Sequence, residues 1–388
     1  MKTLYLDHAA TTPLDERILE AMLPFMTDNF GNANSAHHLG QKAKVVVEDA
    51  REKVAHLINA EPSEVIFTSG GTESDNAVIK GVLAVSGNKK EVITSHLEHH
   101  AVLHPIEMSK MGGFKPVFVE TEDCGRISAR NVEKVITDQT ALVSLMHVNN
   151  EIGCINEIKE IAELCKARNI PIHSDTVQSL GKIPVDVKEL SLDFLSGSAH
   201  KIYGPKGIGI MYVRNGARWI PWMTGGSQER RRRGGTINVP GVVGFAKALE
   251  LAVEEMDENT AKFKHLRKTL LISLDEKLTS CSYHVNGGNE NKVPHIINLS
   301  FSDSDGHGVD GEMLLLNLDI EGICVSNGSA CTSGAVEPSH VLMGLGVEDQ
   351  AAKSSIRVSF GKKNTEEDVH FFVEKLDTVL KRMFNLVQ

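Results

Sequence analysis

The run Asp193-Phe194-Leu195-Ser196-Gly197-Ser198-Ala199-His200-Lys201 indicates the fold, because a short apolar strand ends there beside a lysine. Similar apolar runs alternate with longer amphipathic segments from residue 65 to about residue 213. They occupy residues 65–68, 92–95, 116–119, 142–146, 170–174, 193–196 and 208–213. Seven strands separated mostly by helices predict an α/β fold whose seven-stranded, mainly parallel sheet is covered by helices on both faces.

The composition changes beyond Gly241, where a long helical pattern from residue 242 to about 278 leads into new strands near 295–301. A last strand at 356–359 and an amphipathic helix from Thr365 complete a smaller α+β unit. A chain of 388 residues exceeds what one hydrophobic core normally serves. We therefore expect a large domain of residues 16–260 and a small domain of residues 1–15 and 261–388.

The overall composition is that of an ordinary globular protein, with 41% hydrophobic and 24% charged residues. A formal net charge of −10 argues against nucleic acid or an anionic membrane as a partner. The basic run Arg230-Arg231-Arg232-Arg233 is followed by two glycines, and it is better explained as a loop with one specific anionic contact.

The chain meets a charge before any signal-length apolar stretch develops, and no run approaches the ~20 apolar residues of a membrane span. The six cysteines form no C-x-x-C pair and no disulfide-framework spacing, which fits a reducing compartment. We therefore expect a cytoplasmic protein with no membrane partner.

Polar residues follow the predicted strands, and ligands of parallel sheets bind beyond the carboxyl ends of strands. Lys201 follows one strand, and Asp175 ends a neighbouring one. Pyridoxal phosphate needs a lysine for its aldehyde and a carboxylate for its ring nitrogen, so this pair suggests that cofactor. Taken alone, the two residues also fit a solvated lysine and a turn-capping aspartate.

Groups suited to the cofactor's phosphate follow the first predicted strand, in Ser69-Gly70-Gly71-Thr72-Glu73-Ser74. Gly71 permits close approach of the backbone, and the first turn of the helix that begins there attracts an anion. Ser198 and His200 are expected to help Thr72 bind the phosphate. An ordinary capped glycine turn is the alternative explanation of this segment.

Other strand ends supply groups for the cofactor ring. We expect His99 to lie flat against the ring, Asn150 and Gln178 to hydrogen-bond its phenolate oxygen, and Asp175 to pair with its protonated nitrogen. Each residue also fits a capped turn. Independent turns would not, however, be expected to supply every group that one cofactor needs.

A metal site is the main rival explanation of the histidine-rich segment, because His96, His100 and His104 recur at helical spacing around His99. The segment contains no H-E-x-x-H pattern and no cysteine partner. We therefore expect no metal there. Stoichiometric zinc bound through these histidines would support the rival.

Cys331 lies in Ser326-Asn327-Gly328-Ser329-Ala330-Cys331-Thr332-Ser333-Gly334, a run too polar for a core and rich in small residues. An accessible thiol in such a loop favours a nucleophilic role over a chance surface cysteine. Arg357, on the predicted last strand, is suited to clamping a substrate carboxylate.

The chain resembles the cysteine desulfurases of the class V aminotransferase group, which draw sulfur from L-cysteine for iron–sulfur clusters and thiolated cofactors. The resemblance covers nearly the whole chain. It rests on Tyr5-Leu6-Asp7-His8-Ala9-Ala10-Thr11-Thr12, Gly31-Asn32-Ala33-Asn34-Ser35-Ala36-His37, Thr72-Glu73-Ser74-Asp75-Asn76, Glu98-His99, Asn149-Asn150-Glu151-Ile152-Gly153, Asp175, Gln178, Ser198-x-His200-Lys201, Gly204-Pro205-Lys206-Gly207 and Ser329-Ala330-Cys331-Thr332-Ser333.

This resemblance implies the type I pyridoxal-phosphate fold in a homodimer whose arginine-rich loop reaches the neighbouring subunit. It also implies that Thr236 completes the phosphate site of that neighbour, and that Asn34 and Arg357 hold the substrate carboxylate. Lys201 would remove the α-proton, His99 would carry a proton, and Cys331 would receive the sulfur as a persulfide. The long form of the cysteine loop resembles the branch in which this loop swings out to an acceptor.

The sequence departs from the family pattern in two places, one that affects the expected binding of phosphate and one that affects the expected partner protein. Gly234 replaces the serine common in the arginine-rich loop, and the chain stops at Gln388 without the extended tail that housekeeping members use to dock a cluster scaffold. The expected sulfur acceptor is therefore either a scaffold or a tRNA-thiolation protein. Two other functions stay open: a selenocysteine lyase, and a non-catalytic sulfur carrier or assembly adaptor that needs only Cys331.

Overall fold

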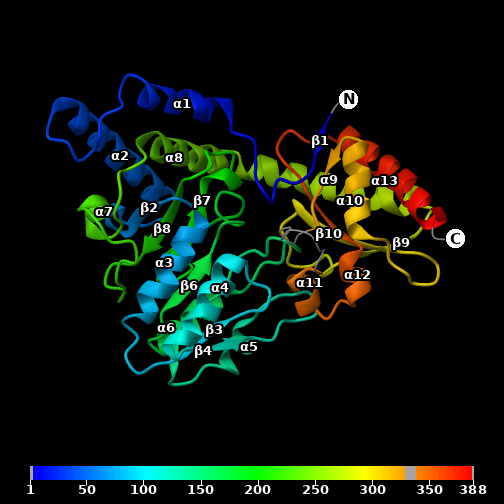
Figure 1. Cartoon of the computed structure of the whole chain (residues 1–388), viewed down its shortest axis with the longest axis horizontal. Helices are drawn as coiled ribbons and strands as arrows, with labels where there is room; N and C mark the ends of the chain where they lie inside the picture. Colours follow the sequence, from blue (N-terminus) through cyan, green and yellow to red (C-terminus); the bar gives the residue numbers. More distant parts are fainter. Residues whose placement is uncertain (1–2, 328–337, 387–388) are drawn as a thin grey trace.

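The computed structural model describes residues 3–327 and 338–386, and Figure 1 shows their arrangement. The described strands form a seven-stranded sheet, a three-stranded antiparallel sheet and a two-stranded parallel pair. No helix in these two ranges is long and apolar enough to cross a membrane.

The large sheet contains the seven strands expected between residues 65 and 213, each within two residues of its predicted bounds. These are β2 (Val65–Thr68), β3 (Glu91–Thr94), β4 (Lys115–Phe118), β5 (Thr140–Ser144), β6 (Ile172–Asp175), β7 (Phe194–Ser198) and β8 (Gly209–Val213). Their order is β2-β8-β7-β6-β5-β3-β4. β8 runs opposite to the other six strands, which all run in one direction. The prediction of a mainly parallel sheet is therefore confirmed.

Helices cover both faces of this sheet, and the alternation of side chains along each strand explains how. Val65 and Phe67 of β2 pack in one core, whereas Ile66 packs in another on the opposite face. The first core includes residues of α1 (Glu16–Met26), α2 (His38–Leu57), α6 (Ile158–Ala167) and α8 (Val239–Glu254). The second core includes residues of α3 (Gly71–Leu83) and α4 (His100–Ser109). Two shorter helices are α5 (Ala129–Glu133) and α7 (Gln228–Arg231).

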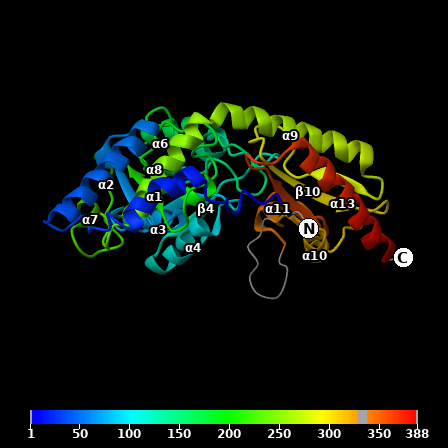
Figure 2. The ribbon, with the colours of Figure 1, turned by 90° about the horizontal axis from the view of Figure 1, so that it is seen from above.

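The smaller unit is built on an antiparallel sheet of order β12-β10-β9. Its strands are β9 (Ser282–Val285), β10 (Ile296–Ser302) and β12 (Ser355–Ser359), and its helices are α9 (Met256–Lys277), α10 (Gly311–Ile320), α11 (His340–Gly344), α12 (Asp349–Lys353) and α13 (Glu366–Leu386). The N-terminal β1 (Leu4–Tyr5) pairs with β11 (Ile323–Cys324). Figure 2 shows α10, α13 and β10 at one end of the molecule and α1 to α4 at the other.

The long helical pattern expected from residue 242 to about 278 is two helices, α8 and α9, which meet at Glu255. The carboxylate of Glu255 accepts a hydrogen bond from Arg17 at 2.6 Å and contacts Lys362. Charged contacts at the junction of α8 and α9 therefore connect Arg17 of the large unit with Lys362 of the small unit. A separate core contains residues of β1, α9, α10, β10, β12 and α13. The domain boundary near residue 260 stays a prediction, which this separation of cores supports.

Candidate active site

A cavity of about 340 Å³ lies at the carboxyl ends of β6 and β7, between the large sheet and β12. Parallel strands bring their carboxyl ends to one edge, so side chains that are distant in sequence meet here. Its lining includes most of the predicted site residues: Gly71, Thr72, His99, Asn150, Asp175, Gln178, Ser198, His200, Lys201 and Arg357.

Lys201 ends a single 3₁₀ turn, Ala199–Lys201, directly after β7. Its Nζ donates hydrogen bonds to the backbone oxygens of Ala9 at 2.8 Å and Ala10 at 2.7 Å. Burial, helped by the charge of Arg357, lowers the pKa of Lys201 to about 8. The amine is therefore held by the N-terminal segment and exists partly in its neutral, nucleophilic form near neutral pH.

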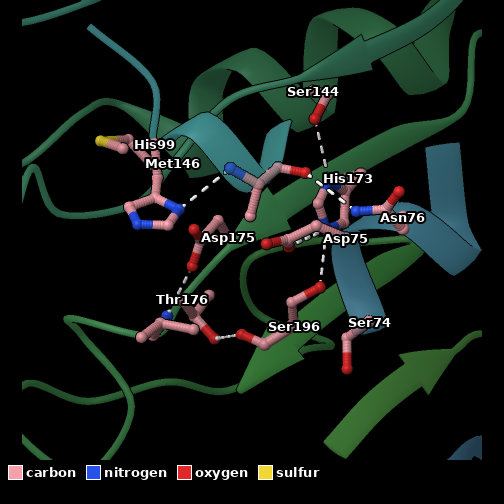
Figure 3. A network of polar contacts seen from close by, with 12 residues as sticks. Ser74, Asp75, Asn76, His99, Ser144, Met146, His173, Asp175, Thr176 and Ser196 are labelled. Carbon is pink, nitrogen blue, oxygen red and sulfur yellow. Dashed lines mark hydrogen bonds and ion pairs between the residues drawn. The ribbon is translucent and has the colours of Figure 1, made fainter. Parts of the chain in front are cut away.

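Asp175 is the last residue of β6, and its Oδ1 accepts a hydrogen bond from the N–H of Val177 at 2.8 Å. Burial raises the pKa of Asp175 to about 6, while the N–H of Val177 and the charge of Lys201 favour the ionised form. Figure 3 shows this carboxyl facing the region of His99. The site thus holds a buried carboxylate on the cavity wall, which is what a cationic ring nitrogen requires.

His99 caps the N-terminus of α4, since its Nδ1 accepts a hydrogen bond from the N–H of Ala101 at 3.0 Å (Figure 3). That bond assigns the ring proton to Nε2 in the neutral form. Burial, followed by the charge of Lys201, lowers the pKa of His99 to about 4. The imidazole is therefore neutral at physiological pH and presents an aromatic ring to the cavity.

The N-terminus of α3 forms a cradle beside Lys201. A Cβ added to Gly71 would lie 2.7 Å from Cγ2 of Val177, so a larger residue would close this corner. First-turn N–H groups of a helix lack intrahelical partners and attract anions. Ser198 and His200 line the same cavity, and Nδ1 of His200 contacts Oγ1 of Thr11 at 3.1 Å.

The two predicted amide ligands differ in their present contacts. Oδ1 of Asn150 is buried without a hydrogen-bond partner among the described residues. The amide of Gln178 is fully engaged, since its Nε2 donates to Ala9 at 2.8 Å and its Oε1 accepts from Lys182 at 2.9 Å. Asn150 thus has an acceptor without a partner, whereas Lys182 and Ala9 fix the orientation of Gln178.

Arg357 reaches the cavity from β12 of the small unit. It is 4% exposed, and its two terminal nitrogens contact Asp7 at 2.8 Å and the backbone oxygen of Asn150 at 3.0 Å. Its Nε is buried without a partner in the part of the chain that the structure describes. A guanidinium with an unused donor beside the cavity is suited to a carboxylate.

Three predicted residues are not brought to this cavity. Asn34 is exposed, and its backbone N–H bonds Oδ1 of Asn32 at 3.0 Å. Thr236 lines a separate cavity of about 130 Å³ together with Glu229 and Arg233. Cys331 lies outside the described residues.

The arginine-rich loop makes anionic contacts within the chain. Arg233 forks onto the carboxylate of Glu73 at 2.7 and 2.9 Å, and Arg230 pairs with Glu48 at 3.0 Å. Arg51 of α2 and Glu229 form a buried ion pair with hydrogen bonds of 2.7 and 2.8 Å, which anchors the loop to α2. Sequence patterns did not indicate Arg51, because an arginine in the middle of an amphipathic helix usually points to solvent.

The histidines proposed as rival metal ligands stack on other rings. His96 stacks on Phe118 with centroids 3.8 Å apart, and His100 stacks on His104 at 4.8 Å. Within residues 3–327 and 338–386, the one group with ligand atoms close enough for a common ion is Asp303, Asp305 and His307, in the small unit.

Comparisons with known proteins agree with this geometry. The model of the aminotransferase class-V family matches residues 4–372. The chain is 44% identical to a cysteine desulfurase IscS of Clostridium botulinum, over 98% of this chain and 95% of that one. It is also 44% identical to a putative cysteine desulfurase, IscS 1, of Bacillus subtilis, over 99% and 100% of the two chains.

Two solved structures extend the similarity to three dimensions. A NifS-like protein superposes with a TM-score of 0.90 at 38% identity, over 98% of this chain and 100% of that one. The structure of SspA in complex with cysteine superposes with a TM-score of 0.80 at 34% identity, over 92% and 99% of the two chains.

Proposed function

This chain belongs to the aminotransferase class-V family and is a cysteine desulfurase, and we propose that its chemistry takes place in the cavity around Lys201 with pyridoxal 5′-phosphate as cofactor. The substrate is L-cysteine, and the products are L-alanine and a sulfur atom bound to Cys331. The observation that carries this assignment is the convergence of Lys201, Asp175 and His99 on one cavity.

The cavity fits this cofactor in two places. The small Gly71 beside the N-terminus of α3 leaves room for the phosphate, which Thr72, Ser198 and His200 would also contact. Asn150 and Gln178 line the cavity, and the side-chain N–H groups of these amides are the donors that would bind the phenolate oxygen. Bound pyridoxal phosphate supplies an electron-accepting ring that stabilises negative charge on the substrate's α-carbon.

Lys201 acts first as the anchor for the cofactor and then as the base. Its Nζ would accept the α-proton of the substrate, a role that requires the neutral amine. Burial supplies this form, since the pKa of Lys201 is lowered to about 8. The carbonyl oxygens of Ala9 and Ala10 orient the amine.

Asp175 and His99 complete the proton chemistry. The Asp175 carboxylate would hold a proton on the ring nitrogen by charge pairing. His99, a neutral imidazole, would lie against the ring, and its Nε2 would carry a proton to or from the reacting groups. Its capping bond to Ala101 keeps the imidazole in that tautomer.

Arg357, aided by Asn34, binds the substrate carboxylate. The guanidinium exchanges part of its contact with Asp7 for the substrate, and its unused Nε provides a second donor. Asn34 lies outside the cavity in this single chain, so its role requires segment 31–40 to approach when substrate or a second subunit binds.

Cys331 is the nucleophile of the sulfur transfer. Its thiolate attacks the substrate's sulfur, so an S–S bond forms as the substrate's C–S bond breaks. The electron pair of the C–S bond stays on carbon, which is protonated to give alanine. One cysteine and one protein thiol therefore yield one alanine and one protein persulfide, with no external oxidant.

The enzyme is proposed to work as a cytoplasmic homodimer. Large apolar side chains on and after α1 are exposed in the single chain, namely Leu19, Leu23, Met26 and Phe30. Such a stripe favours burial against a second copy. Thr236, remote from the cavity of its own chain, would then complete the phosphate site of the neighbour. The acceptor of the sulfur is a cluster scaffold or a tRNA-thiolation protein.

The decisive experiment incubates purified protein with L-cysteine, measures alanine, and maps the persulfide by mass spectrometry. Alanine formed together with a persulfide on Cys331 is expected. Turnover of selenocysteine but not of cysteine would instead indicate a lyase for the selenium compound. A colourless protein that cannot be reconstituted with cofactor would indicate a sulfur carrier or adaptor.

A further inference from the structure

A second carboxyl group, that of Asp75, lies next to Asp175 and has no role in the reaction proposed for the cavity. Asp75 is in the second turn of α3, is 1% exposed, and lines the same cavity. Figure 3 shows Asp75, Asp175 and His173 gathered at this place. His173 and Asp175 are two residues apart on β6, so both side chains point to the face that α3 covers.

The ring of His173 is held on both sides by hydroxyl groups. Nδ1 contacts Oγ of Ser144 on β5 at 2.8 Å, and Nε2 contacts Oγ of Ser196 on β7 at 3.0 Å. Nε2 also lies 3.5 Å from Oδ1 of Asp75. The side chains that form this polar layer next to the cavity are Ser144 of β5, His173 of β6, Ser196 of β7 and Asp75 of α3.

The number of protons in this layer follows from burial. Burial lowers the pKa of His173 to about 3, so the ring is neutral and carries one N–H. The ring therefore donates to one of the two serine hydroxyls and accepts from the other. A hydrogen bond from Ser196 favours the ionised form of Asp75, but burial opposes that form more strongly.

Asp75 has no adequate counter-charge in this layer. Oδ1 is buried without a hydrogen-bond partner, and neutral His173 is the sole basic side chain within ion-pair distance among the described residues. Burial raises the pKa of Asp75 well above its usual range, and the charges of two other acids, Asp175 and Glu98, raise it further. An ionised Asp75 would be a buried, unpaired anion next to a second anion, which is strongly unfavourable.

We propose that Asp75 is a positioning residue that stays protonated, so that the neighbouring Asp175 is the single anion at the base of the cavity. A neutral Asp75 leaves the negative charge on Asp175 and does not compete for the cation on the cofactor ring. Were Asp75 ionised, the repulsion would drive a proton onto Asp175 and cancel the charge pairing. This inference rests on the proposed function for the identity of that ring.

The groups that face Asp75 come from every element around it. They are His173 and Asp175 from β6 and Glu98 from the segment before α4, while Lys201 after β7 acts on Asp175. Glu98 accepts bonds from the N–H of Met146 at 2.9 and 3.1 Å, and burial raises the pKa of Glu98 well above its usual value. Lys201 is the cation whose charge favours the ionised form of Asp175.

Infrared difference spectroscopy of the full-length protein tests the assignment, both as purified and after removal of the cofactor. The spectrum of wild type minus Asp75→Asn at neutral pH is expected to show the C=O band of a protonated carboxyl. The spectrum of wild type minus Asp175→Asn is expected to show carboxylate bands instead. Asp303→Asn, which removes a partly exposed acid with a lowered pKa, is the matched control and should show carboxylate bands.

A protonated-carboxyl band in the Asp175→Asn difference, or in neither difference, overturns the proposal. Cofactor affinity gives a second readout: Asp75→Ala should weaken binding of pyridoxal phosphate roughly tenfold, and Asp75→Asn, a neutral group of the same shape, should restore most of it. Equal losses in both variants would also contradict the proposal. The alanine assay on wild type is independent of these spectra, so a failure of the proposed function is distinguishable from a failure here.

Discussion

The guanidinium of Arg357 pairs with the carboxylate of Asp7 at 2.8 Å, although the two residues lie at opposite ends of the chain. Asp7 immediately follows the β1 region, which pairs with β11, while Arg357 is the central residue of β12. The contact lies within the small unit, at the cavity that Arg357 lines. It also holds a cation beside Lys201, which contributes to lowering the pKa of that lysine.

Arg357→Lys should raise KM for L-cysteine about tenfold, because an ammonium group cannot fork onto a carboxylate as a guanidinium does. Steady-state kinetics of alanine formation measure this change. Arg382→Lys, at an exposed pair with Glu321, is the matched control and should leave KM at its wild-type value. An unchanged KM in Arg357→Lys would remove Arg357 from the substrate site.

Lys201→Ala should lose the visible absorbance of lysine-bound cofactor and the production of alanine, because Lys201 is the one lysine whose amine lines the cavity in the described chain. Absorbance spectra of the purified variant, with and without added pyridoxal phosphate, measure the first effect. Lys159→Ala, at an exposed ion pair, serves as control. Retention of the band would assign the anchor to another lysine.

Cys331→Ser should keep that absorbance but make no alanine from cysteine, because a hydroxyl cannot accept the sulfur. The comparison of spectrum and turnover in one preparation separates loss of the nucleophile from loss of the cofactor. Cys281→Ser, at a thiol with a raised pKa in the small unit, should retain both properties. Full desulfurase activity in Cys331→Ser would overturn the assigned nucleophile.

Acid should weaken the folded state at its buried neutral histidines. Burial lowers the pKa of His99, His147 and His200 to about 4 from an ordinary value of 6.5. Between those values the unfolded chain binds more protons at each of these histidines than the folded one, so their contribution to the free energy of unfolding falls as pH decreases from about 6.5 to 4. Urea unfolding of wild type and of His147→Gln at several pH values measures one such contribution, and identical slopes in the two proteins would contradict the assignment of a neutral buried His147.

The pair of Arg51 and Glu229 should dominate the stability of the arginine-rich loop. Both side chains are buried, and Glu229 also accepts a bond from the N–H of Phe67 at 3.0 Å. Arg51→Ala leaves that carboxylate uncompensated and should cost about 3 to 5 kcal/mol in urea unfolding. The exposed pair of Arg230 and Glu48 provides the control, since Arg230→Ala should cost about 1 kcal/mol or less.

The strands of the large sheet and the polar residues at their ends were predictable because both depend on local patterns. Apolar runs of strand length can be recognised directly in the sequence. The residue after each run lies at the carboxyl end of its strand, whichever strands are its neighbours in the sheet. Asp175 and Lys201 were therefore recognised as site residues before any pairing was known. The family resemblance added Asn34, Thr236 and the type I form of the fold, and the comparisons confirm the fold and the family.

The sequence by itself determined the strands, the helices and the chemical groups that the site contains. Only the tertiary structure decided that β8 lies between β2 and β7, that Ala9 and Ala10 receive the amine of Lys201, and that Asp75 lies behind Asp175. Hydropathy repeats over a few residues, so it shows which face of an element is buried. Partners far along the chain are chosen by packing and by the pairing of buried polar groups, which no local pattern records.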